Sequence, residues 1–310
     1  MTINVVCTID DQYTQHCAVM LSSLFFNNEN HLFHVYIITD DSNTTSFHKL
    51  KTFLEKSKQQ YSIIEIHKDI LLKAPITHHI SLATYFRLFI PEILPSNIDK
   101  VLFIDSDIVI RKSIETLWNI DIQNFSHAAT IAAGMDDYPS HIFLSEESLY
   151  FNAGLMLINL KIWRELKILE RGCELINQKP ERLKWWDQDV LNILLHNSWL
   201  PIDLVWNAQP FIYEESLNNY KYQSRYEKFK YTEAKLDPAI VHFVGGGSAK
   251  PWHYACQHPF KDEYIRYLRT TPWKNSQLIG KPSLIARLRF QLGLGSKFRN
   301  LKHLVSRKFV

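Results

Sequence analysis

Apolar and polar positions follow two alternating patterns along the first hundred residues. Short runs rich in β-branched residues predict strands at residues 3–9, 33–38, 63–66 and 101–104. Apolar residues at helical spacing between these runs predict helices at residues 14–27, 43–59 and 82–89. Ser42 or Asn43 would cap the second of these helices, and Pro91 would end the third. This alternation predicts an α/β fold with a doubly wound, mostly parallel sheet and flanking helices.

The pattern is more mixed beyond residue 110, and it sets a C-terminal tail apart from the rest. Further runs predict strands at residues 128–133, 155–158 and 240–244 and helices at residues 161–177 and 187–196. We expect one domain at residues 1–275, followed by a tail at residues 276–310. Within the tail, one helical face would carry the apolar residues Phe298, Leu301, Leu304 and Val305.

The strand predicted at residues 101–104 leads directly into Asp105-Ser106-Asp107, and three apolar residues follow. Burying carboxylates at such a place is costly unless a positive group pairs with them. Residues two apart on extended chain can point the same way, so both carboxylates can bind one divalent cation that also binds phosphate. Ligands of doubly wound sheets bind beyond the carboxyl ends of strands, where Asp10 and Asp11 also lie. The sequence therefore predicts a metal–diphosphate site at this edge.

Length and composition limit the class of protein. The 310 residues, 46% of them hydrophobic, suit one large α/β domain with an appendage. The four cysteines show neither zinc nor redox spacing, so we expect reduced thiols in a cytosolic protein. The N-terminus lacks the basic and apolar segments of a signal peptide. No apolar run approaches the roughly 18 to 20 residues that span a bilayer, so we expect a soluble or peripheral protein.

The net charge of +3 hides an asymmetry between body and tail. No acidic residue follows Glu263, and residues 264–310 hold eleven Lys and Arg, which leaves 24 Lys and Arg against 32 Asp and Glu before them. The body is therefore mildly acidic and the tail strongly basic, which favours contact between the tail and an anionic surface. A nucleic-acid partner is disfavoured because the acidic body shows no basic, aromatic face.

Five segments together resemble a known enzyme family. Asp105-Ser106-Asp107 resembles the DxD motif of nucleotide-sugar glycosyltransferases. The other segments resemble glycosyltransferase family 8 in order and spacing across about residues 1–255; they are 84–88 (TYFRL), 150–154 (YFNAG), 186–192 (WDQDVLN), and His242 with 250–253 (KPWH). The resemblance implies a GT-A fold and retaining transfer of galactose or glucose from a UDP-sugar to a lipooligosaccharide-type acceptor.

The resemblance also implies the residues of the site. The metal ligands would be Asp105, Asp107 and His242, and manganese suits this set better than magnesium, although magnesium can serve. The nucleotide would be bound by Thr8, Asp10, Tyr13, Ser106, Gly245, Gly247 and Lys250. The donor sugar would be bound by Arg87, Asp136, Asn152, Ala153, Asp187 and Gln188. His242 and Lys250 are eight residues apart, where the family has about six, so either Gly245 or Gly247 could contact the diphosphate.

The catalytic residues that the resemblance implies are Gln188 and Asp187. An amide is a poor nucleophile, so the resemblance implies attack on the same sugar face that UDP leaves, with the departing phosphate oxygen taking the acceptor proton. Gln188 would stabilise oxocarbenium-like charge through its amide oxygen. The basic tail would lie on the inner face of the cytoplasmic membrane, near a glycolipid acceptor.

Other interpretations of the same residues remain open. His242 could be an ordinary core histidine, Asp10 or Asp11 could cap a helix, and the carboxylates near Gln188 could simply favour a helix N-terminus. Gly293 and Gly295 interrupt the tail pattern, so the tail could be solvated chain. For the whole chain, the alternatives are a haloacid-dehalogenase-like phosphohydrolase, whose first Asp attacks phosphate, or a non-catalytic membrane-surface binding protein.

Overall fold

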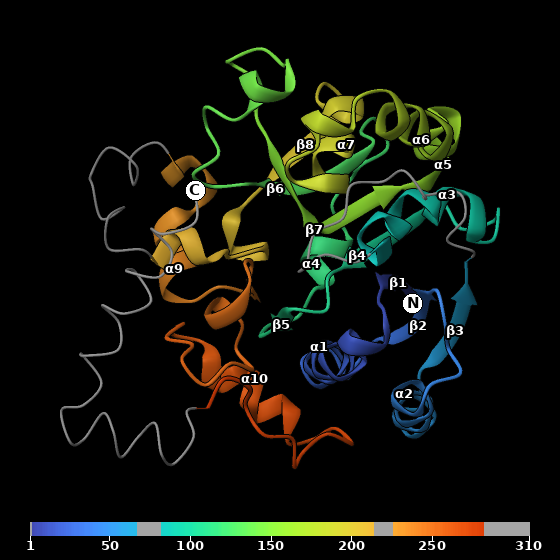
Figure 1. Ribbon diagram of the computed structural model, residues 1–310, viewed down its shortest axis with the longest axis vertical. Helices are drawn as coiled ribbons and strands as arrows, with labels where there is room; N and C mark the ends of the chain where they lie inside the picture. Colours follow the sequence, from blue (N-terminus) through green and yellow to red (C-terminus); the bar gives the residue numbers. More distant parts are fainter. Residues whose placement is uncertain (1, 67–81, 214–225, 282–310) are drawn as a thin grey trace, which may run out of the picture.

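The computed structural model describes residues 2–66, 82–213 and 226–281 (Figure 1). These residues form a seven-stranded sheet in the order β3-β2-β1-β4-β7-β6-β8 and a two-stranded sheet of β5 and β9. The strands of the larger sheet are β1 Thr2–Thr8, β2 Leu32–Thr39, β3 Gln60–Glu65, β4 Lys100–Ile104, β6 His127–Ile131, β7 Phe151–Asn159 and β8 Trp199–Ile202. The smaller sheet pairs β5 Ile108–Ile110 with β9 Ile240–His242 in antiparallel register.

Strand direction is mostly parallel, as predicted. Strands β3, β2, β1 and β4 pair in parallel, and so do β6 and β8. Only β7 runs against its two neighbours in the described sheet, with Ile104 of β4 opposite Leu155. The doubly wound, mostly parallel α/β prediction is confirmed.

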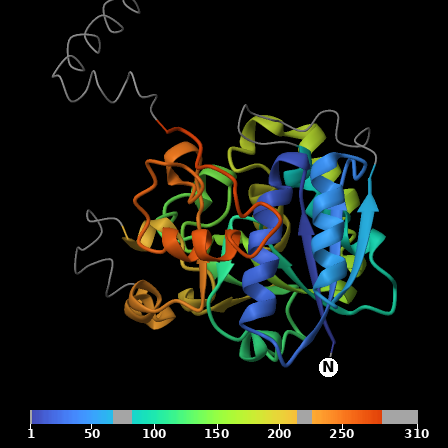
Figure 2. The ribbon, with the colours of Figure 1, turned by 90° about the horizontal axis from the view of Figure 1, so that it is seen from below.

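Helices cover both faces of the sheet (Figures 1 and 2). The α-helices are α1 Thr14–Phe26, α2 Thr45–Lys56, α3 Ile90–Ile93, α4 Glu115–Trp118, α5 Leu160–Glu165, α6 Ile168–Gln178, α7 Trp186–Leu195, α9 Tyr231–Leu236 and α10 Lys261–Leu268. The 3₁₀ helices include η1 Asp11–Tyr13, η3 Leu82–Phe89, η6 Leu204–Trp206, η7 Pro210–Tyr213, η9 Glu227–Phe229 and η10 Gly247–Ala249. Helices α1 and α2 lie on one face, and α3, α5, α6 and α7 on the other.

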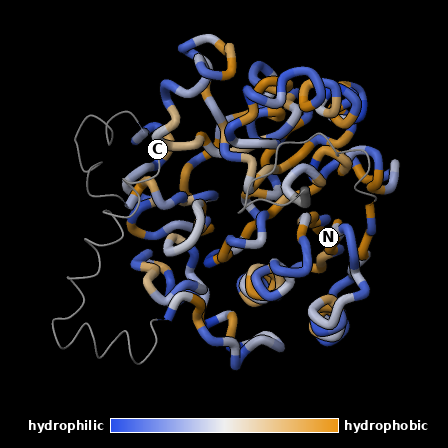
Figure 3. The backbone as a smooth tube through the Cα atoms, viewed as in Figure 1, coloured by the Kyte–Doolittle hydropathy of each residue, from blue (hydrophilic) through white to orange (hydrophobic). Residues whose placement is uncertain are grey.

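The strands are buried on both faces because side chains alternate between two cores. Along β1, Val5 and Cys7 join the core beneath α1 and α2, whereas Val6 joins the core beneath η3 and α7. Figure 3 shows the central strands as largely hydrophobic. Among the described residues, no helix combines the length and apolar character that crossing a bilayer requires.

Several local predictions need correction. The helix predicted at residues 161–177 is two helices, since Lys167 between them has a φ of 51° and cannot continue the first. The cap of α2 is Thr44, whose hydroxyl accepts the Phe47 N–H at 3.2 Å. Pro91 lies in the first turn of α3, where its missing N–H costs nothing. The tail pattern at residues 298–305 lies outside the described residues, so the boundary at residue 275 stays a prediction.

His127 on β6 makes stability depend on pH. Its ring is fully buried, 4.3 Å from the Phe151 ring centroid and stacked on Trp199. Burial lowers its pKa to about 3. An unfolded chain titrates its histidines near pH 6.5, so below that pH the unfolded state binds more protons and the native state loses stability.

Between pH 7 and pH 4.5, protonation of His127 in the unfolded chain lowers the free energy of unfolding by about 3 kcal/mol, at about 1.4 kcal/mol per pH unit below pH 6.5. We therefore expect the His127→Phe variant to lose about 3 kcal/mol less than the parent over this range. Urea unfolding at both pH values measures the loss. His48→Phe, at an exposed position of α2, is the control and should leave it as in the parent. An equal acid loss in the His127 variant would contradict this explanation.

Candidate active site

The two aspartates and the histidine come from segments joined by the smaller sheet. Asp105 directly follows β4, and its N–H donates to the Gly154 carbonyl of β7 at 2.8 Å. Asp107 directly precedes β5, where Ile108 pairs with His242 of β9. The Phe243 N–H donates to the Asp107 carbonyl at 2.9 Å. Pairing of β5 with β9 thus brings a histidine 135 residues away along the chain to the aspartate pair.

Asp105, Asp107 and His242 form a cluster that fits a divalent cation. One ligand atom from each lies within 4.8 Å of the others. His242 Nε2 is 3.2 Å from Asp107 Oδ1 and 3.9 Å from Asp105 Oδ2. A Cβ on Gly154 would lie 2.2 Å from His242 Cε1 and 2.7 Å from Asp105 Oδ2, so only glycine leaves these groups free. Two carboxylates and one imidazole suit manganese or magnesium.

The two aspartates have different electrostatic surroundings. Burial raises the pKa of Asp105, although Arg87 opposes this rise. Burial also acts to raise the pKa of Asp107, but Lys250 and His242 outweigh it and hold this pKa well below its usual range. Lys250 Nζ pairs with the Asp107 carboxylate and donates to the Phe243 carbonyl at 3.0 Å. Asp107 therefore keeps its charge in a buried place.

Arg87 on η3 joins the aspartate pair to α7. It pairs with Asp105 Oδ1 at 3.0 Å and with Asp187 Oδ2 at 2.7 Å, and its Nη1 donates to the Ala153 carbonyl at 2.6 Å. Its guanidinium lies 4.4 Å from the Phe103 ring centroid. Burial raises the pKa of Asp187 to about 7 against the opposing charge of Arg87. One cation thus orders two carboxylates, the half-buried one of Asp105 and the buried one of Asp187.

Gln188 is held by both ends of its amide. Its Oε1 accepts the Ala153 N–H at 3.0 Å, and its Nε2 donates to the Tyr150 hydroxyl at 3.2 Å. That hydroxyl in turn donates to Asp189 Oδ1 at 2.6 Å. Asp189 is fully buried and also accepts a hydrogen bond from the Tyr138 hydroxyl at 2.9 Å. It therefore holds the Tyr150 hydroxyl in place, which in turn fixes the orientation of the Gln188 amide.

Asn207 contacts the candidate metal cluster, and sequence reasoning missed it. Its Oδ1 accepts from His242 Nδ1 at 2.9 Å, and its Nδ2 donates to Asn152 Oδ1 at 2.9 Å. This bond places the histidine proton on Nδ1 and leaves the Nε2 lone pair available to a metal ion. No motif marks Asn207, because its role arises where η6 packs beside β9: the His242 N–H donates to the Ala208 carbonyl at 3.0 Å.

Asn207→Ala is expected to weaken Mn²⁺ binding about 10- to 100-fold, because the histidine loses the group that orients it. Calorimetric titration of Mn²⁺ in the presence of UDP measures this. Asn28→Ala is the matched control: Asn28 is similarly buried and binds the Leu24 carbonyl and the Ile114 N–H, away from the cluster. Equal weakening in both variants would show that Asn207 acts only through stability.

Most residues predicted for the site form one connected network in the structure. The connected residues are Arg87, Asp105, Asp107, Asn152, Ala153, Asp187, Gln188, His242 and Lys250. Ser106 is buried between the aspartates. Gly245 and Gly247 both have positive φ, at +108° and +56°, in the loop that leads to Lys250. Both conformations favour glycine, so φ does not distinguish the two.

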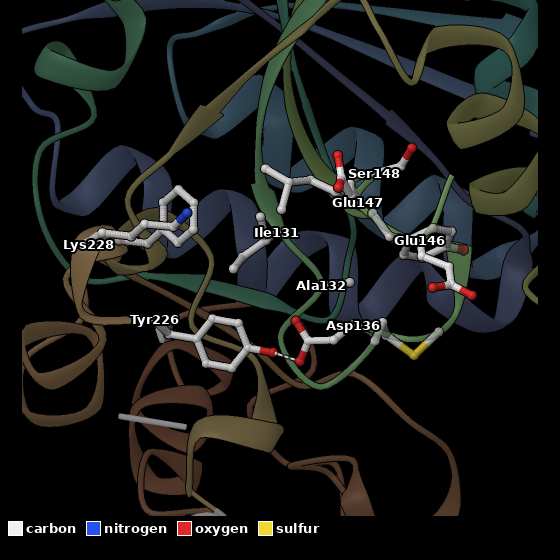
Figure 4. A pocket seen from close by; sticks show the side chains of 12 residues that line it. Ile131, Ala132, Asp136, Glu146, Glu147, Ser148, Tyr226 and Lys228 are labelled. Atoms are coloured by element: carbon white, nitrogen blue, oxygen red, sulfur yellow. Dashed lines mark hydrogen bonds between the residues drawn. The ribbon is translucent and has the colours of Figure 1, made fainter. Parts of the chain in front are cut away.

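The predicted nucleotide residues on the N-terminal side lie at the end of β1. Thr8 is its last residue, and Asp10 caps η1 by accepting the Tyr13 N–H at 3.2 Å. The Tyr13 ring packs edge-on against Trp252, 6.1 Å between centroids. Burial raises the Tyr13 pKa, and the nearby charge of Asp107 raises it further. Asp136 accepts a hydrogen bond from Tyr226, and both residues line a cavity beside the end of β6 (Figure 4).

Comparisons with known proteins agree with this geometry. The chain is 30% identical over 286 residues to general stress protein A of Bacillus subtilis (strain 168), covering 91% of this chain and 97% of that protein. It is 29% identical over 290 residues to lipopolysaccharide 1,2-glucosyltransferase of Escherichia coli (strain K12), covering 91% and 82%. The crystal structure of galactosyltransferase LgtC with donor and acceptor sugar analogs superposes with a TM-score of 0.77 at 24% identity, covering 87% and 96%.

The family assignment rests on a match over most of the chain. The sequence profile named "Glycosyl transferase family 8" matches residues 4–256, which include every element of the network above. The solved structure shares the fold, and the alignment with the glucosyltransferase above covers 91% of this chain. The chain is therefore a glycosyltransferase that belongs to glycosyl transferase family 8.

Proposed function

We propose that this glycosyltransferase uses manganese, or magnesium in its place, to move galactose or glucose from a UDP-sugar to a lipopolysaccharide-type acceptor with retention of configuration. The single observation that carries the proposal is the cluster of Asp105, Asp107 and His242, which Arg87 and Ala153 connect to the amide of Gln188. Relatives named as lipopolysaccharide 1,2-glucosyltransferase and 1,3-galactosyltransferase support the hexose and the acceptor class.

The diphosphate would be bound at the cluster and the adjoining loop. A bound divalent cation would neutralise the negative charge that develops on the leaving diphosphate, without any proton transfer to it. Lys250 would donate to a phosphate oxygen from its place beside Asp107, and the backbone near Gly245 or Gly247 can approach an anion closely. Asp10 and Tyr13 would bind the uracil, with Thr8 and Ser106 at the ends of the adjacent strands.

The donor hexose would lie among Asn152, Ala153 and Asp187, where Arg87 keeps the carboxylates ordered. The bond between the anomeric carbon and the phosphate oxygen breaks as the acceptor oxygen bonds to that carbon from the same face. The departing phosphate oxygen takes the acceptor proton. The amide oxygen of Gln188, fixed through Ala153 and Tyr150, would stabilise the positive charge on the ring.

The acceptor would be a glycolipid at the inner face of the cytoplasmic membrane, reached through the basic residues that follow Glu263. Tethering at that surface raises the local acceptor concentration. The proposed membrane contact rests on the positive charge of these residues, and the proposed acceptor rests on the relatives' names. Residues 282–310 lie outside the described part of the chain. Family membership argues against the phosphohydrolase and the non-catalytic membrane-binding protein.

Proton NMR of the released sugar tests the donor and the stereochemistry together. The protein is incubated with Mn²⁺ and either UDP-galactose or UDP-glucose, without acceptor, and the anomeric signals are followed from the first minutes. We expect one of the two donors to release the α-hexose first, because both carry an α-linked sugar. First appearance of the β-hexose would contradict retention.

A further inference from the structure

Ile279 and Gly280, near the end of the described chain, lie against the segment that follows Lys250. The Ile279 N–H donates to the Trp252 carbonyl at 3.0 Å, and the Tyr254 N–H donates to the Ile279 carbonyl at 2.8 Å. These bonds form a parallel bridge between Ile279 and His253. We call Ile279 and Gly280 the strap. The family profile ends at residue 256, so the strap lies outside the part of the chain that it matches.

Gly280 lets the strap approach His253 closely. It has a φ of +72°, which favours glycine, and a Cβ at this position would lie 2.0 Å from His253 Nε2. The imidazole is itself held, because its Nδ1 accepts the Ala255 N–H at 3.1 Å. Turning the ring away from a new methyl group would therefore break this bond. The contact between the strap and His253 thus requires a glycine.

The segment beneath the strap holds the backbone of Lys250. The His253 N–H donates to the Lys250 carbonyl at 2.9 Å. Trp252, between these two residues, is buried; its ring stacks on His16 at 3.5 Å between centroids and lies 5.6 Å from the Tyr264 ring. Trp252 is therefore held in two ways, by the strap at its carbonyl and by the aromatic stack at its ring.

The place of the Lys250 ammonium group depends on this support. Lysine carries its charge on a flexible four-carbon stem, so neighbouring groups decide where the charge lies. In the structure, Nζ pairs with the Asp107 carboxylate, donates to the Phe243 carbonyl at 3.0 Å and lies 5.5 Å from the Trp252 ring centroid. A shift of residues 252–254 would displace both the Lys250 backbone and the ring beside its ammonium group.

We propose that Ile279 and Gly280 are positioning residues for Lys250. By holding residues 252–254, the strap keeps the ammonium group beside Asp107, where it can donate to an anion bound at the metal cluster. The identity of that anion as a diphosphate rests on the proposed function, whereas the hold on Lys250 does not. Neither strap residue belongs to the metal cluster, so loosening the strap should affect phosphate binding rather than binding of the base.

Chemical labelling of lysines tests the hold on Lys250 without any ligand. The full chain is treated briefly with formaldehyde and cyanoborohydride, and dimethylation of each lysine is followed by mass spectrometry. Gly280→Ala drives a methyl group against His253, and Ile279→Pro removes the N–H that donates to Trp252. We expect Lys250 to be labelled about fivefold faster in each variant than in the parent, because a loosened segment opens more often.

Ile279→Val is the matched control, since it keeps both backbone hydrogen bonds and changes an exposed side chain. It should label Lys250 at the parent rate. Lys100, half-buried at the start of β4, donates to the Trp118 carbonyl at 2.8 Å and reports loosening elsewhere in the fold. Unchanged labelling of Lys250 in both strap variants would overturn the proposal. An equal rise at Lys100 would do so too, because the strap would then support the whole fold.

Equilibrium dialysis with labelled UDP and labelled uridine, in the presence of Mn²⁺, tests whether the hold serves anion binding. Uridine carries the base and no phosphate, so its binding should not depend on Lys250. In Gly280→Ala we expect about tenfold weaker UDP binding and unchanged uridine binding, because a hydrogen bond to a charged group typically contributes this much. Equal weakening of both ligands would show a merely structural role and overturn the proposal.

The outcomes separate this proposal from the proposed function. A parent protein that binds no UDP would contradict the proposed function, and the labelling of Lys250 would still decide whether the strap positions it. Faster labelling of Lys250 in both strap variants, with UDP bound as tightly as in the parent, would overturn the strap's role in anion binding and leave the proposed function intact.

Discussion

Asp107→Asn is expected to reduce metal-dependent UDP release from the donor sugar by about 10³-fold or more, a loss of roughly 4 kcal/mol of transition-state stabilisation. The substitution keeps the volume of the side chain and removes one charge from the cluster. It also leaves Lys250 buried without its carboxylate partner, which is costly in its own right. The charge of Asp107 is thus required twice, by the cation and by Lys250.

The control for this variant is Asp237→Asn. Asp237 pairs with Lys112 at 2.7 Å and with Arg111 at 3.0 Å, at an exposed place outside the cluster. Exposed ion pairs contribute little, about 0 to 1 kcal/mol, so this variant should keep the parent's rate. An Asp107→Asn protein that stays within tenfold of the parent rate, at saturating Mn²⁺ and donor, would rule out the assigned role.

Gly154→Ala should reduce Mn²⁺ affinity and UDP release together, by about 100-fold or more, although it adds only one methyl group. The new Cβ would lie 2.2 Å from His242 Cε1 and 2.7 Å from Asp105 Oδ2. Neither group can move freely, because Asn207 holds the histidine and Arg87 holds the aspartate. The clash can therefore be relieved only by moving the metal ligands apart. Overpacking at other sites typically costs about 1 to 3 kcal/mol of stability and leaves ligand geometry unchanged.

Gly172→Ala is the matched control for this steric effect. Its Cβ would meet the end of the Leu88 side chain at 3.1 Å, a flexible methyl that can shift. We expect this variant to keep both Mn²⁺ affinity and UDP release. Calorimetry gives the affinity and thermal unfolding shows whether each protein is folded. A folded Gly154→Ala protein with parental Mn²⁺ affinity would contradict the crowded geometry of the cluster.

The sequence was most informative where a single strand carries both the fold and the chemistry. The run at residues 101–104 could be assigned because four apolar residues precede two carboxylates, a combination that needs burial and a positive partner at once. The structure supplies the partners: Arg87 for Asp105, and Lys250 with His242 for Asp107. The family resemblance named these residues, and the geometry shows how they are paired.

Long-range pairing could not be predicted from one sequence. An apolar run such as 155–158 has no direction, so nothing indicated that β7 runs antiparallel to β4. The contact of β5 with β9, which brings His242 to the aspartates, depends on register between distant segments. Asn207 and Gly154 affect the cluster only because the fold brings them close to it. The hydrogen bond of Asn207 to His242 and the absence of a Cβ on Gly154 therefore leave no periodic pattern in the sequence.

The most direct test of the central claim is UDP release from UDP-galactose and UDP-glucose by metal-free protein, before and after Mn²⁺ is added. The double variant Asp105→Ala, Asp107→Ala is measured in parallel. We predict slow release from one of the two sugars only after the metal is added, and none from the double variant. Release that needs no metal, or that persists in the double variant, would contradict a diphosphate-binding metal site at Asp105, Asp107 and His242.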